Sequence, residues 1–383
     1  MLVFFLQPIA FGSWLPRIPD VQQALGLGPA GLAMVLLGLP AGTLLTLPFA
    51  GPLVGRIGAR AAIIFGFMLY AIAVSLPGLA TNPVLLFVAL MLCGSTISFV
   101  ELGLNVEADK VEKATGRLIM NKAHGFWSLG IMTGSIIGSA LAAAGVEARW
   151  AILDVAAVTL VVGPLVGRLV PDYGPDSAAS VPGVKPPVGF RLPDWALLGI
   201  CLFVFGVTMT EGAMADWSAV FLRDVLGVGS EAGIGYAVFA LFVAAGRFWG
   251  DWAKSRLGAV VLARASVVFA IVGIGVLTLA PSLPFALFGL AIVGLGASVG
   301  FPLAVTAAAD LDPARSSTSV ATLSFIALLG FLVGPPLIGF IGQHVDLRFG
   351  IAALLPILLV SLALSGRLTR KAAEPHLLAQ GEA

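Results

Sequence analysis

The sequence predicts an all-α membrane protein with twelve transmembrane helices in two six-helix parallel repeats. Its composition, its apolar segments and an internal repeat support this fold class. Of the 383 residues, 59% are hydrophobic and 11% are charged. Soluble domains have about 25% charged residues. A soluble protein this apolar could not cover its surface with polar groups, so lipid must surround most of the chain.

Twelve apolar segments are long enough to be transmembrane helices, since a bilayer core of about 30 Å requires about 20 residues per helix. They cover residues 1–15, 30–50, 61–80, 84–108, 118–143, 150–170, 195–215, 232–250, 259–280, 284–308, 316–341 and 349–366. None alternates as a β-barrel strand would. The first has no charged n-region and no small-residue cleavage site, so it is expected to be a membrane helix rather than a signal peptide.

Basic residues predict the orientation. If the N-terminus is cytoplasmic, 17 of the 21 lysines and arginines, Arg247 among them, fall in cytoplasmic loops or the tail. The other four fall outside: Arg17, Arg149, Arg223 and Arg348. The positive-inside rule therefore predicts a multi-pass protein of the bacterial inner membrane with both termini in the cytoplasm.

The longest polar stretch, "PDYGPDSAASVPGVKPPVGFRLPD", covers residues 171–194 and is rich in Pro, Gly and Ser. Such a composition is typical of a linker with little structure of its own. It separates a predicted N-terminal six-helix bundle (1–170) from a C-terminal one (195–370). A cytoplasmic tail (371–383) is expected to follow.

The sequences on the two sides of the linker resemble each other at a roughly constant offset. The corresponding positions are "RIG" at 56–58 and "RLG" at 256–258, Trp14 and Trp217, Gly130 and Gly330, and Gly134 and Gly334. Their shared order favours duplication over chance. An even number of spans per half gives both halves the same orientation, an arrangement that secondary transporters use with the binding site between the halves.

The loop after the second segment, "GPLVGRIGAR" (51–60), resembles the G-x-x-x-D-R-x-G-R-R motif of the major facilitator superfamily. The shared residues are Gly51, Arg56, Gly58 and Arg60, whereas the family's Asp is Gly55 here and its first terminal Arg is Ala59. The second-half copy, "GRFWGDWAKSRLG" (246–258), retains Asp251 and Arg256. The resemblance implies gating roles for Arg56, Arg60, Asp251 and Arg256, with the departures placing the usual charge relay of the first copy in doubt.

Four further stretches, "NVEADKVE", "HGFWSLG", "GLGASVGFP" and "FLVGPPLIG", resemble the YbjJ and MosC branch of that superfamily. MosC-like proteins are associated with rhizopine, an inositol derivative, and the branch is distantly similar to proton-coupled fucose symporters. The resemblance implies a transporter, and it is much more specific for the fold than for the substrate.

Glu101 is a carboxylate inside the fourth apolar segment. Counted from the outer end at about 1.5 Å per residue, it lies past mid-depth, in the inner half of the membrane. A charge at the bilayer centre costs about 2.5–3.5 kcal/mol, so this side chain must face a cavity or another helix. Asn105 follows on the same helix face. We expect Glu101 to bind a proton and Asn105 to contact solute; the alternative is a neutral or paired glutamate that holds helices together.

His124 begins the fifth segment and is predicted to share the inner half of the membrane with Glu101. The two side chains could pair and titrate as a unit; alternatively, His124 is a structural donor to a carbonyl. Trp127 and Asn121 lie on neighbouring turns and are candidate solute-binding residues. An indole can stack on a sugar-like ring, although packing explains Trp127 equally well.

Glu211 lies in the seventh segment, in the predicted outer half, and is a further candidate for proton or solute binding. The glycine-rich "GLGASVGFP" (294–302) is expected to kink, which makes Ser298 and Phe301 candidates to line the cavity. Gln7 and Trp14 are candidates in the first segment. The alternative for Glu211 is a place in an outer gate, and helix packing alone would explain the glycines of 294–302.

Several function classes lack support in the sequence. It contains no G-x-x-x-x-G-K-[ST] phosphate loop, no His/Cys spacing typical of a metal site and no G-x-S-x-G elbow. Cys93 and Cys201 both lie in apolar runs, and a net charge of +1 gives no sign of nucleic-acid binding. We therefore expect no enzyme, no cofactor, no metal and no nucleic-acid partner.

The sequence predicts a secondary active transporter, expected to be a monomer, whose partners are a small-molecule substrate, protons and the lipid bilayer. Alternating access would move a small polar solute such as a sugar, polyol or inositol-like compound, by proton symport. Two alternatives remain open: proton-antiport efflux of drugs or metabolites, and a membrane sensor that binds a ligand without transporting it.

Overall fold

The computed structural model describes residues 1–117, 119–174, 193–311 and 316–368. Within these ranges every regular element is a helix, and eleven helices are long and apolar enough to cross a membrane. The remaining predicted segment, 1–15, corresponds to α1 (Leu2–Trp14), which continues through η1 (Leu15–Arg17) into α2 (Ile18–Ala24). All twelve predicted segments are therefore helical, and the predicted fold class is confirmed.

The N-terminal half, residues 1–174, contains five further long or paired helices. They are α3 (Pro29–Leu36) with α4 (Gly38–Ile57), α5 (Ala59–Ser75), α6 (Pro83–Thr115), α7 (Met120–Ala143) and α8 (Ala148–Gly167). The described residues end there at 174, so most of the predicted linker lies outside them, as does the predicted tail.

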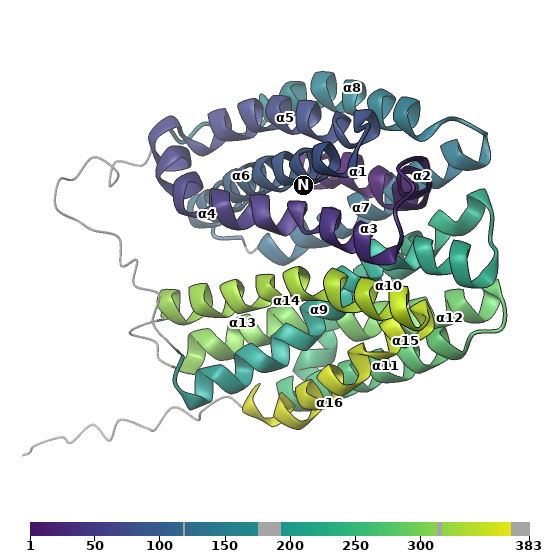
Figure 1. Cartoon of the computed structure of the whole chain (residues 1–383). Coiled ribbons are helices and arrows are strands. Elements are labelled where there is room, and N and C mark those ends of the chain that lie inside the picture. Colours follow the sequence, from purple (N-terminus) through teal and green to yellow (C-terminus); the bar gives the residue numbers. More distant parts are fainter. Residues whose placement is uncertain (118, 175–192, 312–315, 369–383) are drawn as a thin grey trace, which may run out of the picture.

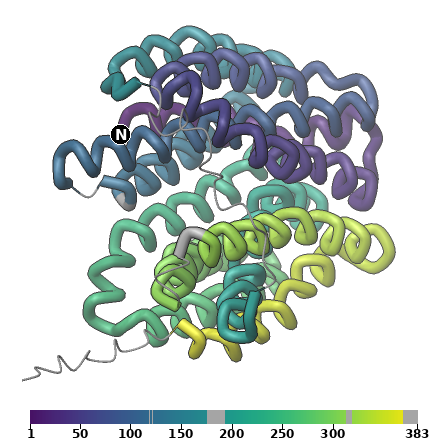
Figure 2. The backbone as a smooth tube through the Cα atoms, turned by 90° about the vertical axis from the view of Figure 1, so that its left-hand side faces the viewer, coloured from purple at the N-terminus to yellow at the C-terminus, as the bar shows by residue number. Residues whose placement is uncertain are grey.

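The C-terminal half, residues 193–368, repeats this series of helices. It contains α9 (Trp195–Leu226), η4 (Ser230–Gly233), α10 (Ile234–Leu257), α11 (Ala259–Leu279), α12 (Leu283–Ala297), α13 (Gly300–Leu311), α14 (Ser316–His344), α15 (Leu347–Ala352) and α16 (Leu354–Leu364). Helices α1–α8 lie together on one side of the molecule and α9–α16 on the other (Figure 1), and a perpendicular view shows the same division (Figure 2).

The two halves use the same backbone conformation at corresponding turns. Gly58 follows α4 with a φ of 84°, and Gly258 follows α10 with a φ of 78°. Glycine adopts this left-handed region without the strain that a side chain would cause. The glycine shared by "RIG" and "RLG" is therefore required by the turn itself, whatever role the neighbouring charges have.

Glycines also allow close helix packing in each half. An added Cβ at Gly130 or Gly134 of α7 would overlap backbone carbonyls of α1. An added Cβ at Gly330 of α14 would lie 2.8 Å from the carbonyl oxygen of Phe205 in α9. Small residues at such positions let helix backbones approach each other. The corresponding pairs α1–α7 and α9–α14 therefore owe their contact to the repeated glycines.

We call the end of the molecule where α8 ends and α9 begins the linker end, and the opposite end the distal end. The two halves are in contact at the distal end. At the distal end, Arg223 of α9 donates to Gln22 Oε1 at 2.8 Å and to the carbonyl of Pro19. Nearby, Gly339 of α14 packs against Ala33 of α3. The distal end is thus closed by direct contacts between the halves.

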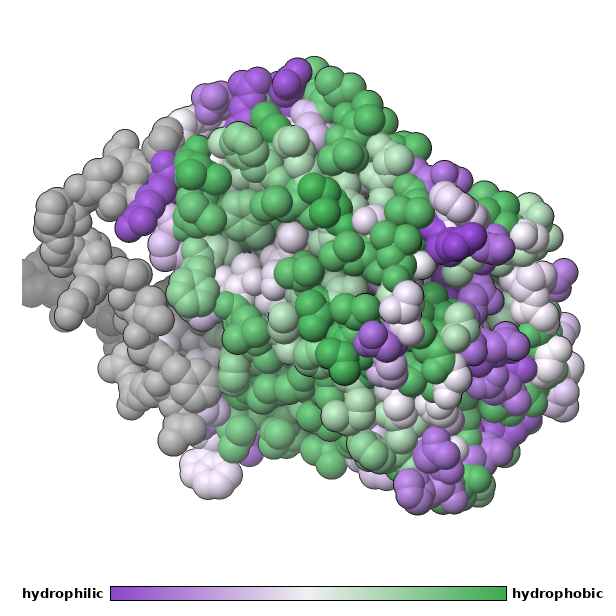
Figure 3. Space-filling view, turned by 45° about the horizontal axis from the view of Figure 1, so that its top comes forward, coloured by the Kyte–Doolittle hydropathy of each residue, from purple (hydrophilic) through white to green (hydrophobic). Residues whose placement is uncertain are grey.

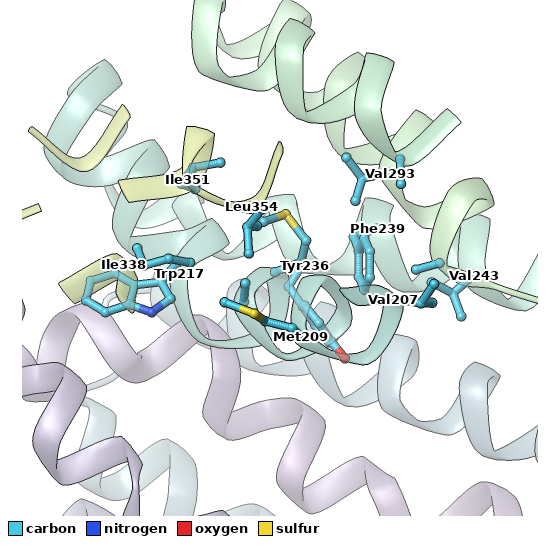
Figure 4. Packing of buried hydrophobic residues seen from close by; sticks show 14 of the residues in the cluster. Val207, Met209, Trp217, Tyr236, Phe239, Val243, Val293, Ile338, Ile351 and Leu354 are labelled. Atoms are coloured by element: carbon cyan, nitrogen blue, oxygen red, sulfur yellow. The ribbon is translucent and has the colours of Figure 1, made fainter. Parts of the chain in front are cut away.

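The surface and the interior are both hydrophobic, as a protein surrounded by lipid requires. Figure 3 shows a broad hydrophobic surface across the middle of the molecule, with hydrophilic side chains gathered toward its ends. In the C-terminal half, Trp217 and Met209 of α9, Tyr236 and Phe239 of α10, and Ile338 of α14 converge in a buried cluster (Figure 4). This core fixes α9 and α10, the helices that carry Glu211 and Arg247.

Candidate functional site

The first group of polar side chains lies in the N-terminal half, where α1, α6 and α7 meet. The indole Nε1 of Trp127 donates to Gln7 Oε1 at 3.0 Å and to Glu101 Oε1 at 3.1 Å. Gln7 is buried and Glu101 is half-buried. One indole N–H therefore serves acceptors from two other helices, and three predicted site residues form a single cluster.

Glu101 is a half-buried carboxylate whose hydrogen-bond partner is neutral. Within the part of the chain that the structure describes, its hydrogen bond comes from Trp127 and no ion pair involves it. Taking a carboxylate out of water without a counter-ion costs several kcal/mol. Uptake of a proton by Glu101 would remove this cost.

The second group surrounds Arg247 of α10 and joins the two halves. Its Nη2 forms an ion pair with Glu211 Oε1 of α9 at 3.1 Å. Its Nη1 donates to Ser128 Oγ of α7 at 2.7 Å, across the interface between the halves. Its Nε donates to the carbonyl oxygen of Ser298 at 3.4 Å. Every nitrogen of this guanidinium thus has an acceptor, two in its own half and one in the other.

The carbonyl of Ser298 is available to Arg247 because a helix breaks at this point. Helix α12 ends at Ala297 and α13 begins at Gly300, so the predicted kink in 294–302 is present. Pro302 stands four residues after Ser298 and has no N–H to donate back to its carbonyl. The proline therefore leaves an acceptor at the position that Arg247 reaches.

A cavity of about 340 Å³ lies beside Arg247, toward the linker end. Its polar lining includes His124 from the N-terminal half and Arg247, Asp251, Lys254 and Ser298 from the C-terminal half. Phe301 also lines it, so both candidates from the glycine-rich segment lie where a solute in this cavity would meet them. Their role in binding stays a prediction.

His124 does not join the Glu101 cluster. Its exposed ring lies edge-on to Phe4, with ring centroids 5.8 Å apart, and also lines the cavity beside Arg247. Among the described residues no hydrogen bond links it to Glu101. The predicted coupling of the two groups therefore has no direct contact behind it in this conformation, and it stays a prediction.

Three other solute-binding candidates lie apart from the cavity. Asn105 is half-buried one turn beyond Glu101, and its Oδ1 is buried without a hydrogen-bond partner in the described part of the chain. Trp14 is 3% exposed and belongs to the same apolar core as Trp217, its counterpart in the repeat. The side chain of Asn121 lies outside the described residues.

The predicted gating residues lie near the linker end. Arg60 donates to the carbonyl of Arg168 at 2.7 Å and lies 3.7 Å from Asp172, both in its own half. Arg56 and Arg256 are exposed at the ends of α4 and α10. Asp251 lines the cavity. Both of these contacts of Arg60 stay within the N-terminal half. Gating by the four residues stays a prediction.

One position was wrongly expected, and two residues of the site, Arg247 and Ser128, were missed. Arg247 lies inside α10 at the interface between the halves, so its assignment to a cytoplasmic loop is wrong. Glu211 lies near the middle of α9, which runs from Trp195 to Leu226, and its depth in the outer half of the membrane stays a prediction. Ser128 carried no signal in the sequence. Arg247 did carry one, because it falls within the predicted segment 232–250, where an ionisable residue indicates a functional site.

Comparison with known proteins gives the family. The family model of the Major Facilitator Superfamily matches residues 1–328. The chain belongs to this superfamily. It is 31% identical over 375 residues to an uncharacterized MFS-type transporter of Yersinia pestis, covering 96% of this chain and 94% of the relative. It is 29% identical over 346 residues to the membrane protein MosC of Rhizobium meliloti, covering 90% and 83%.

Solved structures share the fold at low sequence identity. A bacterial homolog of the human lysosomal transporter Spinster, in an inward-facing and occupied conformation, matches with a TM-score of 0.71 and 17% identity, covering 96% of this chain and 95% of that one. The nucleoside transporter NupG matches with a TM-score of 0.70 and 15% identity, covering 96% of each. The expected family is therefore confirmed, and the protein is a multi-pass membrane transporter of the major facilitator superfamily.

Proposed function

We propose that this transporter imports a small neutral polar solute, such as a sugar, a polyol or an inositol-like compound, by proton symport. The two halves would rock about the cavity beside Arg247, so that it opens to one side of the membrane at a time. Membership of the superfamily supports transport itself. The polar lining of the cavity and the resemblance to the MosC branch support the solute class.

Glu101 carries the proposal of proton coupling. Its partner is a neutral indole, whereas the charge of Glu211 is balanced by Arg247. A proton on Glu101 therefore changes the net charge of its surroundings from negative to neutral. Neutralisation lowers the cost of closing apolar helices around the site and so biases which conformation is stable. His124 and Glu211 are further groups that would carry the proton or respond to its charge.

The orientation and assembly form part of the same proposal. Arg17, Arg149, Arg223 and Arg348 lie in or beside the distal-end turns, and we assign that end to the outside. The linker end then faces the cytoplasm of a bacterial cell, where Arg56, Arg60, Asp251 and Arg256 would control access to the cavity. A single chain contains both halves of the site, so a monomer is sufficient.

Uptake into liposomes tests the proposal. The purified chain is reconstituted, a pH gradient is imposed, and accumulation of radiolabelled myo-inositol and of a panel of neutral sugars is measured. We expect at least one of these probes to be concentrated when the outside is acidic. Glu101→Gln should abolish accumulation yet retain exchange of labelled for unlabelled probe. If the variant concentrates the probe as well as the wild type, Glu101 is not the coupling site.

Proton-antiport efflux is the competing function. A segment of 134 residues, 35% of this chain, is 25% identical to multidrug resistance protein 2 of Bacillus subtilis. Liposomes preloaded with a fluorescent cationic dye distinguish the two functions. An antiporter would expel the dye when the outside is acidic, whereas the proposed symporter would leave it inside. A sensor would bind the probe and move neither compound.

A further inference from the structure

We infer that Arg247 forms a solute subsite in which a hydroxyl group of the transported molecule replaces the hydroxyl of Ser128. The inference rests on the proposed function and adds to it a specific contact and a consequence of that contact. The identity of the rest of the solute is not needed for this inference, because the hydrogen bonds of Arg247 define which group the subsite accepts.

Ser128 behaves as an internal substitute for a solute hydroxyl. Its Oγ is buried, accepts from Arg247 Nη1 at 2.7 Å and lies 3.1 Å from the carbonyl of His124, to which it donates. The contact with Arg247 is the shortest of the three that the guanidinium makes. A hydroxyl on a solute has the same capacity to accept from Nη1 and to donate elsewhere.

The charge of the subsite favours a neutral oxygen over an anion. Glu211 already balances Arg247 through an ion pair of 3.1 Å, and both side chains are 18% exposed. The nitrogen that faces Ser128 therefore needs an acceptor but no additional negative charge. A carboxylate brought to this point would meet a pair that is already neutral and would lose its own hydration. Hydroxyl or ether oxygens meet the requirement at lower cost.

A cavity lies directly beside Arg247. Arg247 lines the cavity of about 340 Å³ together with Ser298 and His124. The same cavity presents Asp251 and Lys254 nearer the linker end, so further hydroxyls would have charged groups to bind. The subsite therefore opens onto space that can hold a small polar molecule.

Displacement of the Ser128 hydroxyl by the solute would also break the hydrogen bond that links the two halves. Ser128 belongs to α7 and Arg247 to α10, so their bond crosses the interface. One turn earlier, an added Cβ at Gly125 would lie 2.8 Å from the ring of Phe248, which shows how closely these helices approach. Once a solute hydroxyl occupies Nη1, this bond no longer holds α7 against α10. Solute binding would then free the halves to move.

Binding measurements test the exchange. Titration calorimetry without a pH gradient compares wild type, Ser128→Ala and Ser128→Thr for myo-inositol, D-glucose and the anionic analogue D-glucuronate. Because the alanine variant leaves Nη1 without its internal acceptor, it should bind a neutral probe about tenfold more tightly. The threonine variant keeps the hydroxyl and should bind like the wild type. Unchanged or weaker binding by Ser128→Ala, no neutral probe bound by any variant, or tighter binding of D-glucuronate than of D-glucose would each overturn the inference.

A distance measurement tests the link and separates the two proposals. Spin labels at Ala114→Cys and Ser255→Cys, both exposed near the linker end of opposite halves, report the separation of the halves. Native Cys93 and Cys201 are buried, and a control without the introduced cysteines measures their labelling. Ser128→Ala should shift the distances without solute, in the direction in which the bound probe shifts the wild type. Normal proton-driven uptake with no such shift would reject the inference alone, whereas the shift without proton-driven uptake would reject the proposed function alone.

Discussion

Ser298 lies four residues before Pro302, and the carbonyl that this proline leaves without a helical donor accepts a hydrogen bond from Arg247. A break in a helix of the C-terminal half thereby supplies one of the three acceptors of a guanidinium that also reaches the N-terminal half. The bond is long, at 3.4 Å. It therefore contributes less to holding Arg247 in place than the shorter contacts with Glu211 and Ser128 do.

Glu101→Gln is expected to uncouple transport from the proton gradient. The amide keeps an oxygen that can accept from Trp127 Nε1, so the cluster with Gln7 should survive, while the group can no longer take up a proton. Proton-driven accumulation of the probe should fall to the level of empty liposomes. Asp109→Asn is the control, since Asp109 lies on the same helix but pairs with Lys113 in an exposed position. Loss of accumulation in both variants would point to general damage to α6.

The Arg247–Glu211 pair should behave as a unit in stability measurements. Arg247→Ala leaves a partly buried carboxylate unpaired, and we expect unfolding in detergent to become easier by about 2–3 kcal/mol, somewhat less than for a fully buried pair. Adding Glu211→Gln to that variant should restore much of the loss, because no unpaired charge remains. Chemical denaturation of the two single variants and the double variant gives the coupling energy. Additive effects would show that the two side chains do not depend on each other.

Trp127→Phe should weaken the junction of α1, α6 and α7. The substitution keeps an aromatic ring but removes the N–H that serves both Gln7 and Glu101. Leaving buried acceptors unsatisfied costs about 1–3 kcal/mol, which thermal unfolding in detergent would detect. Trp150→Phe is the control, because Trp150 is 51% exposed on α8. Equal effects of the two substitutions would mean that the loss of ring size, and not of the hydrogen bonds, is responsible.

Gly134→Ala should destabilise the N-terminal half, because the added methyl group would overlap the backbone of α1 at Ile9. Forcing the helices apart typically costs about 1–3 kcal/mol. Gly275→Ala provides a matched test within α11, where nothing lies within 4 Å of the added atom. There the higher helix propensity of alanine should stabilise slightly, by up to about 1 kcal/mol. A comparison of thermal unfolding midpoints checks both, and equal shifts would contradict close packing of α1 and α7.

The fold could be predicted almost completely because lipid restricts the choices. A largely apolar segment such as 259–280 has to satisfy its backbone internally and so must be a helix. Particular features of the site were also predictable: Glu101 because a charge in an apolar segment requires an explanation, and Ser298 because glycines and a proline surround it. Arg247 was misplaced because it stands three residues from the end of the predicted segment 232–250 and was counted with the loop that follows, whereas α10 extends to Leu257.

The sequence by itself determined that the chain is a bundle of membrane helices in two related halves, and that ionisable groups lie within it. Those properties follow from composition and spacing along the chain. Only the tertiary structure decided which groups meet: Glu101 with an indole, Arg247 with Glu211 and with Ser128 of the other half. Partners so far apart in sequence are chosen by how helices rotate and pack against each other, and that rotation depends on contacts from every neighbouring helix at once.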